Sequence, residues 1–303
     1  AISFFVKLKP QKYIITRHDV WPFHLYFAQL LGIQTVFINA NLYSNSTRFS
    51  FGLKSFNCWL FHQFDLILTG SENLRNTIMN LAPRSNVKIT GDSRFDQVIQ
   101  RSRNSKKDLL PLIFENSQNI ILGSMVDSDI PILSQALDAL NQHFFDNDIF
   151  LIIVPHEVAD NDLLPLEKLL SQKGLSHQRF SKFDEVNSPQ VLIMDKVGIL
   201  ADLYAYAKIV YIGAGFSTGV HSVIEPAVHK CVVAYGPRVD ILDEAVEMTQ
   251  CNAGIMIHNG NELANVFEKI KHPTEVKELG NRAYQFVVKK EYASKRIINE
   301  IFK

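Results

Sequence analysis

A glycine-rich stretch late in the chain carries the clearest candidate chemistry. Gly213, Gly215 and Gly219 follow an apolar run, and His221 opens a stretch with the composition of a helix. A loop of this kind presents backbone N–H groups and the positive end of a helix dipole, which together bind anions such as phosphate. Because Glu225 is four residues after His221, the two share one helix face, and the carboxylate could accept hydrogen bonds from sugar hydroxyls. The same glycines would also suit the close packing of an ordinary βαβ unit.

Three other loops in the second half of the chain also follow apolar runs of strand length. They contain Ser124, then Pro155 and His156, and then Gly198. The carboxyl ends of parallel strands meet at one edge of a sheet, where α/β proteins bind their ligands. We therefore expect these residues to lie near the glycine-rich loop, although each histidine could instead be a packing residue.

Strands and helices alternate along the whole chain, which is typical of parallel sheets with crossover helices. The sequence predicts an α/β protein with two doubly wound, Rossmann-like domains. We expect the terminal helical region to be broken near Gly280. The predicted parts are a first domain at 1–103, a linker at 104–118, a second domain at 119–278, and a terminal helix at 279–303 that could cross back to the first domain.

Composition describes a globular protein. Of the 303 residues, 47% are hydrophobic and 20% are charged, which excludes a disordered chain. The three cysteines, Cys58, Cys231 and Cys251, have no CxxC spacing. Such a set indicates neither a disulfide framework nor a zinc site, and we expect no metal and no cofactor.

Charge is distributed unevenly although the formal net charge is zero. Residues 1–110 carry 14 Lys and Arg against 6 Asp and Glu, whereas residues 111–303 carry 17 against 25. The first half therefore has a net charge of +8 and favours an anionic partner, such as a membrane surface, a phosphorylated lipid or nucleic acid. Alternatively, this charge imbalance could have arisen by chance among solvent-exposed side chains, without a functional role.

The sequence shows no signal peptide and no convincing membrane span. The apolar stretch 20–42 is interrupted by Pro22, Gly32 and several amides, which favours a helix followed by a strand. The chain begins with Ala and enters a strand pattern almost at once. We expect the first domain to be incomplete in this chain.

Five motifs, in order along the chain, together resemble the 3-deoxy-D-manno-octulosonic acid (Kdo) transferases, a family with the GT-B fold. The resemblance covers essentially the whole chain. Each motif alone has little specificity, and the order and spacing of all five carry the resemblance. They are Asp19-Val20-Trp21-Pro22, Gly91-Asp92-Ser93-Arg94-Phe95-Asp96, Val154-Pro155-His156, the segment from Gly219 through His221 and Ser222 to Glu225, and Gly236-Pro237.

The chain departs from the family pattern at several positions. Ser222 stands where the family usually has Asn, and Asn41 and Asn45 stand where it has arginines. The loop at 123–129 lacks the family's histidine and second glycine. The segment that carries the family's proposed general base, and the family's membrane anchor, would lie before Ala1, so the catalytic residue is unknown from this chain.

The resemblance implies an inverting, metal-independent transfer of Kdo from CMP-Kdo to a lipid A precursor, at the cytoplasmic face of the inner membrane. A basic first domain would face anionic lipid. Nucleic acid is not expected as a partner, because aromatic and basic residues do not form a recognisable binding motif. The implied acceptor-side residues are Asp19, Trp21, Arg94 and Asp96. The implied donor-side residues are Ser124, Pro155, His156, Gly198, Gly215, Gly219, His221, Ser222 and Glu225.

Two alternatives to this function remain open on the sequence. One is a GT-B enzyme with another donor, such as a UDP-sugar or a CDP-alcohol. The other is a truncated or degenerate transferase that binds nucleotide or lipid without turnover. Arg94 could likewise form only a surface ion pair with Asp92 or Asp96.

Overall fold

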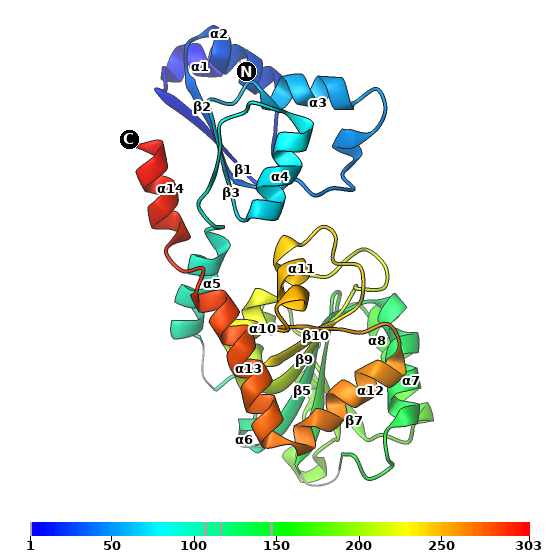
Figure 1. Cartoon of the computed structure of the whole chain (residues 1–303). Coiled ribbons are helices and arrows are strands. Elements are labelled where there is room, and N and C mark those ends of the chain that lie inside the picture. The colour runs from blue at the N-terminus through cyan, green and yellow to red at the C-terminus, as the bar shows by residue number, and fades with distance from the viewer. Residues whose placement is uncertain (1, 106–107, 116, 146–147) are drawn as a thin grey trace. The chain divides into compact units, whose positions relative to one another are not determined.

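The computed structural model of the chain describes residues 2–105, 108–115, 117–145 and 148–303, and it contains two compact units (Figure 1). The first unit comprises residues 1–97 and 290–303, and the second comprises residues 98–289. Each unit is built around its own parallel sheet.

The first unit has a four-stranded sheet in the order β1-β2-β3-β4, so its strands follow one another in a single direction. Helices connect successive strands. The elements are α1 (Ile2–Leu8), β1 (Lys12–Thr16), α2 (Pro22–Leu30), β2 (Gln34–Ala40), α3 (Lys54–Phe61), β3 (Leu66–Thr69), α4 (Glu72–Leu81), β4 (Val87–Ile89), the first residues of α5 (Arg94–Arg103), and α14 (Ala293–Ile301).

Both faces of this sheet are covered, because alternate side chains of a strand point to opposite sides. Phe37 and Ile67 face a core that includes side chains of α2, α3 and α4. Val36 and Leu68 face the other side and pack against Ile297 of α14. Figure 1 shows α14 beside the sheet of this unit. Burying an aliphatic side chain of this size stabilises a fold by about 1.5–3 kcal/mol. The C-terminal helix is therefore an integral layer of the first unit.

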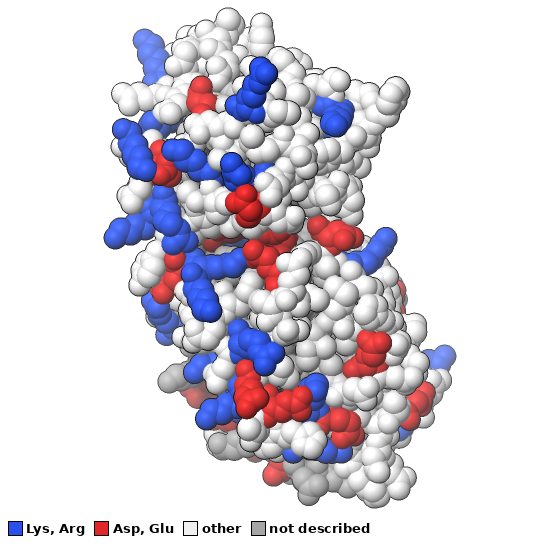
Figure 2. Space-filling model, in the orientation of Figure 1, with Lys and Arg blue, Asp and Glu red and all other residues white. Residues whose placement is uncertain are grey.

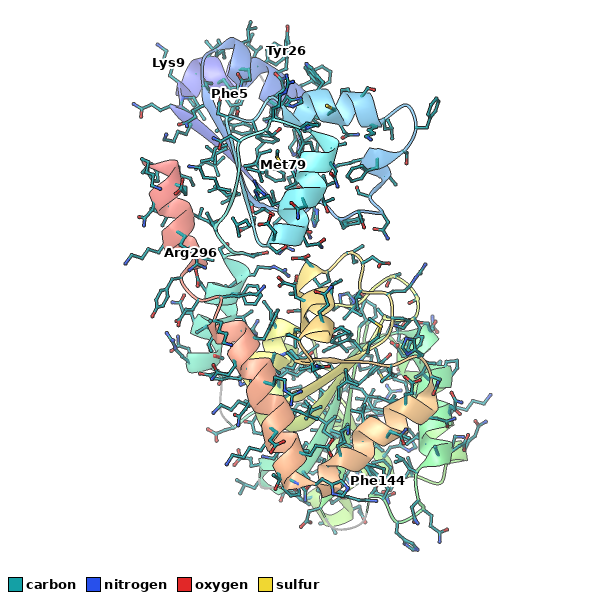
Figure 3. All side chains as sticks on the ribbon, viewed as in Figure 1. Phe5, Lys9, Tyr26, Met79, Phe144 and Arg296 are labelled. Atoms are coloured by element: carbon teal, nitrogen blue, oxygen red, sulfur yellow. The ribbon has the colours of Figure 1, made fainter. Side chains whose placement is uncertain are left out.

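Hydrogen bonds fix the start of α14 against the end of β4. The Asp96 carboxylate accepts bonds from the backbone N–H groups of Tyr292 and Ser294, both at 2.6 Å. Arg296, which Figure 3 labels at the base of this helix, donates from Nε to the carbonyl of Thr90 at 2.7 Å. The carboxylate satisfies N–H groups that a helix start leaves unpaired. Asp96, which the sequence suggests as an acceptor-side residue, thus has both oxygens engaged in capping.

The second unit has a seven-stranded parallel sheet in the order β11-β10-β9-β5-β6-β8-β7. Strand order reverses between β5 and β9, so this unit is doubly wound. The strands are β5 (Gln118–Met125), β6 (Ile149–Pro155), β7 (His177–Arg179), β8 (Val191–Ile193), β9 (Ala207–Ile212), β10 (Val232–Tyr235) and β11 (Ile255–Met256). The helices are α6 (Leu112–Glu115), α7 (Ile130–Ala139), α8 (Asp160–Gln172), α9 (Leu200–Leu203), α10 (Ile224–Val228), α11 (Asp243–Gln250), α12 (Gly260–Glu268) and α13 (Pro273–Val288).

The central strands of the second unit are buried on both faces. Ile120, Ile121 and Leu122 of β5 are all fully buried, as continuous apolar runs in parallel strands predict. One face packs against side chains of α7, α8 and α12, and α10 and α13 lie against β9 and β10. The core therefore holds the strand ends in fixed positions at each edge of the sheet.

The boundary between the two units lies at an earlier residue in the chain than the sequence suggests. Residues 98–118, expected to end the first domain and form a linker, lie in the second unit. Phe114 is fully buried and its ring packs edge-on against Phe150, with centroids 5.0 Å apart. Asn119 donates to the carbonyl of Phe114 at 2.6 Å, which ties the segment to the start of β5.

The expected break near Gly280 is wrong, because α13 continues through it to Val288. A Cβ at Gly280 would collide with the carbonyl oxygen of Lys230 and lie 2.8 Å from its carbonyl carbon. This glycine therefore serves close packing of α13. The helix after the glycine-rich loop is also shorter than predicted, since it begins at Ile224 and ends at Val228.

The apolar stretch 20–42 forms α2 and β2, as the sequence predicts. Pro22 is the first residue of α2, and Gly32, with φ +69°, follows its end. Within the described ranges, no helix has both the length and the apolarity that crossing a membrane requires.

Replacing Gly280 with Ala tests the packing of α13. An added methyl group must displace the backbone of Lys230, and overpacking of this kind costs about 1–3 kcal/mol. Alanine has a higher helix propensity than glycine, and this difference offsets about 1 kcal/mol of the packing cost. We expect G280A to lower the free energy of unfolding by about 1 kcal/mol in urea titrations. G70A, whose Cβ would make only ordinary contacts at 3.7 Å, is the control. Equal stability of G280A and the wild type would contradict this packing account.

Candidate functional site

The carboxyl ends of five strands of the second unit lie at one edge of its sheet. Parallel pairing joins β10 to β9, β9 to β5, β5 to β6 and β6 to β8 (Figure 1). Every donor-side residue predicted from the sequence except Glu225 lies in a loop leaving this edge or within the last two residues of a strand. The switch point between β5 and β9 is also here, which is where doubly wound sheets bind ligands.

The glycines at this edge allow backbones to approach one another. A Cβ at Gly213 would lie 2.7 Å from Oδ2 of Asp129, and one at Gly215 would lie 2.5 Å from the backbone nitrogen of Gly236. Gly219 has φ +111°, a conformation that side chains rarely adopt. These glycines therefore do serve close packing of the backbone, which is the alternative that the sequence offered.

Several N–H groups of the loop are already hydrogen-bonded within the protein. The N–H of Gly213 donates to Gly123, that of Gly219 donates to Ala214, and that of Val220 donates to Arg238. In the described part of the chain, no hydrogen-bond partner is found for five other N–H groups of the loop, those of Gly215, Phe216, Thr218, His221 and Ser222. Donors available to an anion are thus distributed along the loop, and those of His221 and Ser222 lie at its end. Because α10 starts only at Ile224 and is one turn long, its dipole contributes less than the sequence suggests.

Buried Asp129 holds the loop in place, and the sequence reasoning missed it. One oxygen accepts from the hydroxyl of Tyr211 at 2.7 Å, and the other accepts from the N–H groups of Ala214 at 2.9 Å and Val126 at 3.0 Å. The carboxylate is fully buried. Burial of the Tyr211 hydroxyl first, and then the charge of Asp129, raise the pKa of Tyr211. A polar residue after β5 was the only signal for this role.

His156 and His221 lie against each other at the site. Their rings are stacked with centroids 4.9 Å apart and an angle of 13° between planes. Partial loss of water around His221, and then the nearby charge of His156, lower the pKa of His221, while Asp129 acts in the opposite direction. Because two positive charges repel each other, a stacked pair of imidazoles takes up a first proton more easily than a second. An anion bound beside the rings would favour their protonated form.

A small pocket lies beside His156. Its volume is about 130 Å³, and its lining combines apolar side chains with three carboxylates. Those carboxylates would repel phosphate but accept hydrogen bonds from hydroxyl groups. The lining residues are Met125, Val126, Asp127, Ile130, Pro155, His156, Glu157, Asp162 and Leu166.

The structure brings only some of the predicted donor-side residues together. Ser124, with φ +54°, lies at the end of β5 against Gly213, and His156 meets His221. Glu225 lies on α10 and lines a separate small pocket that also includes Arg101. Gly198, with φ +81°, has open space around it.

The acceptor-side candidates of the first unit include an ion pair. Nε of Arg94 lies 3.2 Å from Oδ2 of Asp92, so the pairing suggested as an alternative from the sequence is present. Asp19 and Trp21 are exposed, and Trp21 retains 61% of its accessible surface.

Two further arginines of the first unit, Arg17 and Arg48, act on His18. Burial first, and then the charges of Arg17, Arg48 and Arg94, lower the pKa of His18, with Asp19 opposing. The Asp92 carboxylate lies 4.0 Å from Arg17 and 3.2 Å from Arg94, so it offsets part of this positive charge.

The described residues contain no group of three or more His, Cys, Asp or Glu side chains arranged to hold a metal ion.

Comparisons with known proteins agree with the resemblance. A model of the family described as 3-deoxy-D-manno-octulosonic-acid transferase (kdotransferase) matches residues 1–97. A curated 3-deoxy-D-manno-octulosonic acid transferase from Chlamydia muridarum is 27% identical over 270 residues, covering 86% of this chain and 60% of the relative. The chain thus spans about 60% of the length of that relative.

Solved structures agree with the fold. The C-terminal CMP-Kdo binding domain of WaaA from Acinetobacter baumannii superposes with a TM-score of 0.51 at 19% identity, covering 64% of this chain and 97% of that domain. Anabaena Alr3699/HepE in complex with UDP gives 0.66 at 13% identity, covering 99% of this chain and 81% of the other. At these identities, the structures establish the fold.

The fold class is GT-B, with Rossmann-like α/β units, as the sequence predicts. Among the described strands, however, only the sheet of the second unit is doubly wound, because the order β1-β2-β3-β4 of the first contains no reversal. The chain is a relative of the 3-deoxy-D-manno-octulosonic acid transferases.

Replacing Asp129 with Asn tests the support of the loop. An amide would present N–H donors where the backbone N–H of Ala214 or the Tyr211 hydroxyl already donates. We expect D129N to lower the free energy of unfolding by about 2–3 kcal/mol, because buried donors lose their acceptor. Y211F removes a single bond and should cost about 1 kcal/mol. Chemical denaturation measures both, and a D129N effect no larger than that of Y211F would argue against this role.

Proposed function

We propose that the protein transfers Kdo from CMP-Kdo to a lipid A precursor, with inversion and without a metal ion. The stacked pair of His156 and His221, beside the glycine-rich loop at the carboxyl edge of the second sheet, is the observation that carries the proposal. The structural likeness of this unit to a domain titled as CMP-Kdo binding supports the choice of donor.

In the proposed reaction, an acceptor hydroxyl attacks the anomeric carbon of Kdo. The bond from that carbon to the phosphate oxygen breaks, its electron pair stays with CMP, and the hydroxyl proton passes to a base. Negative charge therefore grows on the phosphate, and groups that stabilise it accelerate the step. The N–H groups of His221 and Ser222, together with the two imidazoles, are placed to do so.

We assign the remaining donor contacts from position. The carboxylates around the pocket beside His156 would accept hydrogen bonds from sugar hydroxyls, with Asp127 and Glu157 nearest in sequence to the strand ends. The resemblance, and not a shared pocket, is the ground on which we assign Glu225 to the ribose and the loop at Gly198 to the cytosine.

The arginines of the first unit suit an acceptor with phosphate groups. Arg17, Arg48 and Arg94 act together on His18, and guanidinium groups bind phosphate in a bidentate geometry. They offer positive charge in a chain where Asn41 and Asn45 stand in place of the family's arginines.

An apolar strip around α3 supports contact with a membrane. Leu53, Phe56 and Trp59 recur every three residues, so they share one face, and all three are exposed. Phe51 beside them is fully exposed, and Lys54 begins the helix. Figure 2 shows Lys and Arg side chains among broad uncharged areas over this unit. Aromatic and basic groups together favour an anionic bilayer, and we propose the cytoplasmic face of the inner membrane.

A titration with CMP, UMP and UDP, followed by an assay of CMP release from CMP-Kdo with a lipid A precursor, tests the proposed function. Tightest binding of CMP and release that depends on the acceptor are the expected results. Preference for UDP would instead favour a UDP-sugar donor, as the shared fold with UDP-bound HepE permits. CMP binding without release would favour a binding protein without turnover.

The histidine pair predicts a pH dependence of CMP binding. Because the pKa of His221 is lowered below the usual histidine value, its positive charge is present only at acidic pH and is lost before neutral pH is reached. The double variant H156Q/H221Q should bind CMP about tenfold more weakly than the wild type at pH 5 and only slightly more weakly at pH 8. The ratio of the two dissociation constants removes the titration of CMP itself, whose phosphate has a second pKa of about 6. A ratio that does not change with pH would contradict the role of the pair.

Substitutions on α3 test the membrane contact. F56S/W59S removes two exposed rings whose centroids are 5.8 Å apart and should reduce partition into phosphatidylglycerol vesicles by tenfold or more, on the order of the transfer energy of two aromatic side chains. V186S, which removes an exposed side chain of the second unit, is the matched control. Equal loss in both variants, measured by vesicle co-sedimentation, would show that α3 has no particular role.

A further inference from the structure

The second unit has a large basic pocket at the edge of its sheet opposite to the candidate site. Its volume is about 500 Å³, within the usual range for small-molecule sites. Three lysines and a histidine surround an apolar floor. The lining residues are Gln118, Ala205, Ala207, Lys208, His229, Lys230, Ile270, Pro273, Val276, Lys277 and Asn281.

Strand pairing explains why residues distant in sequence meet here. Asn119 pairs with Ala207, and Val232 pairs with Ile209, so Gln118, Lys208 and Lys230 lie at the amino ends of three neighbouring strands. A strand the length of β5 spans roughly 25 Å, which separates this pocket from the glycine-rich loop.

Helix α13 supplies the opposite wall. Pro273, Val276, Lys277 and Asn281 recur at helical spacing, so one face of α13 lines the pocket. Gly280 on the same helix lets the backbone of Lys230 approach closely. The lysine of α13 is thereby held opposite those at the strand ends.

The charge of this pocket is not balanced by its lining. None of the lining side chains is a carboxylate. Within the part of the chain that the structure describes, Lys208, Lys230 and Lys277 have no carboxylate within 4 Å of their ammonium groups, and Lys230 lies over the ring of Tyr284 at 5.0 Å. All three lysines are exposed to solvent, so an anion can reach their ammonium groups and gain from their combined positive charge.

The backbone at Lys230 is a second indication. Lys230 has φ +63° directly after the end of α10, its N–H donates to Ala227, and the N–H of Cys231 donates to Pro226. This is the helix-ending turn in which glycine is strongly preferred at the left-handed position. A lysine at this position makes the left-handed backbone less stable than a glycine would. It also places an ammonium group at the pocket.

The geometry points to a binding site for a small soluble anion that carries two phosphoryl groups. The site is independent of the proposed transferase reaction, because it uses other residues at the other edge of the sheet. Three ammonium groups match the charge of a diphosphate, and the amides of Gln118 and Asn281 and the ring of His229 can complete its hydrogen bonds.

Calorimetric titration of the whole chain with inorganic pyrophosphate tests this site. K208Q/K277Q should bind at least about tenfold more weakly than the wild type, because each charge-assisted bond contributes a factor of this order. K168Q, which removes an exposed lysine of α8 outside the pocket, and H156Q/H221Q should each retain this binding event. Loss of the event in H156Q/H221Q instead would assign it to the nucleotide edge, and equal weakening in K168Q would assign it to overall charge.

A further variant separates binding from folding. K230G relieves the left-handed backbone, so its melting temperature should rise, while its affinity for pyrophosphate should fall by about tenfold. Unchanged affinity in K230G would overturn the site. Binding to phosphatidylglycerol vesicles that depends on Lys208 and Lys277, without binding of pyrophosphate, would overturn the choice of a small soluble ligand.

Discussion

The candidate site depends on one buried carboxylate. Asp129 accepts hydrogen bonds from Tyr211 on β9, Ala214 in the glycine-rich loop and Val126 after β5. Because a buried carboxylate must be fully hydrogen-bonded to be tolerated, these bonds fix the two strands that flank the switch point relative to the loop. The end of that loop carries His221, whose ring then meets His156 from β6. Removing the carboxylate would leave three donors unpaired and the loop unsupported.

The sequence predicted the edge of the sheet well, because apolar runs followed by polar residues mark the carboxyl ends of parallel strands. For that reason it predicted that His156 lies near the glycine-rich loop, but it did not predict that the ring of His156 stacks on that of His221. It could not predict contacts that depend on packing between distant segments. Asp96 caps a helix almost two hundred residues later, and Gly280 permits close approach to Lys230 where the sequence suggested a helix break. Local patterns do not encode such partners.

The two units present different chemistry. The described strands of the first unit are joined by helices on one side, and the C-terminal helix covers the other, so residues 290–303 are as necessary to its core as β2 or β3. Three arginines act on His18 in the first unit, whereas the candidate site of the second unit combines imidazoles, free N–H groups and carboxylates. A phosphorylated acceptor for the first and a nucleotide-linked sugar for the second follow from this difference.

Backbone NMR of the labelled chain during titration with CMP tests the central claim most directly, because it reports where the nucleotide binds without requiring turnover. The account predicts that amide shifts concentrate at Ser124, His156, His221 and Ser222, the carboxyl edge of the second sheet. Shifts confined to Lys208, Lys230 and α13 at the opposite edge, or absent at a CMP concentration that saturates related sites, would contradict it.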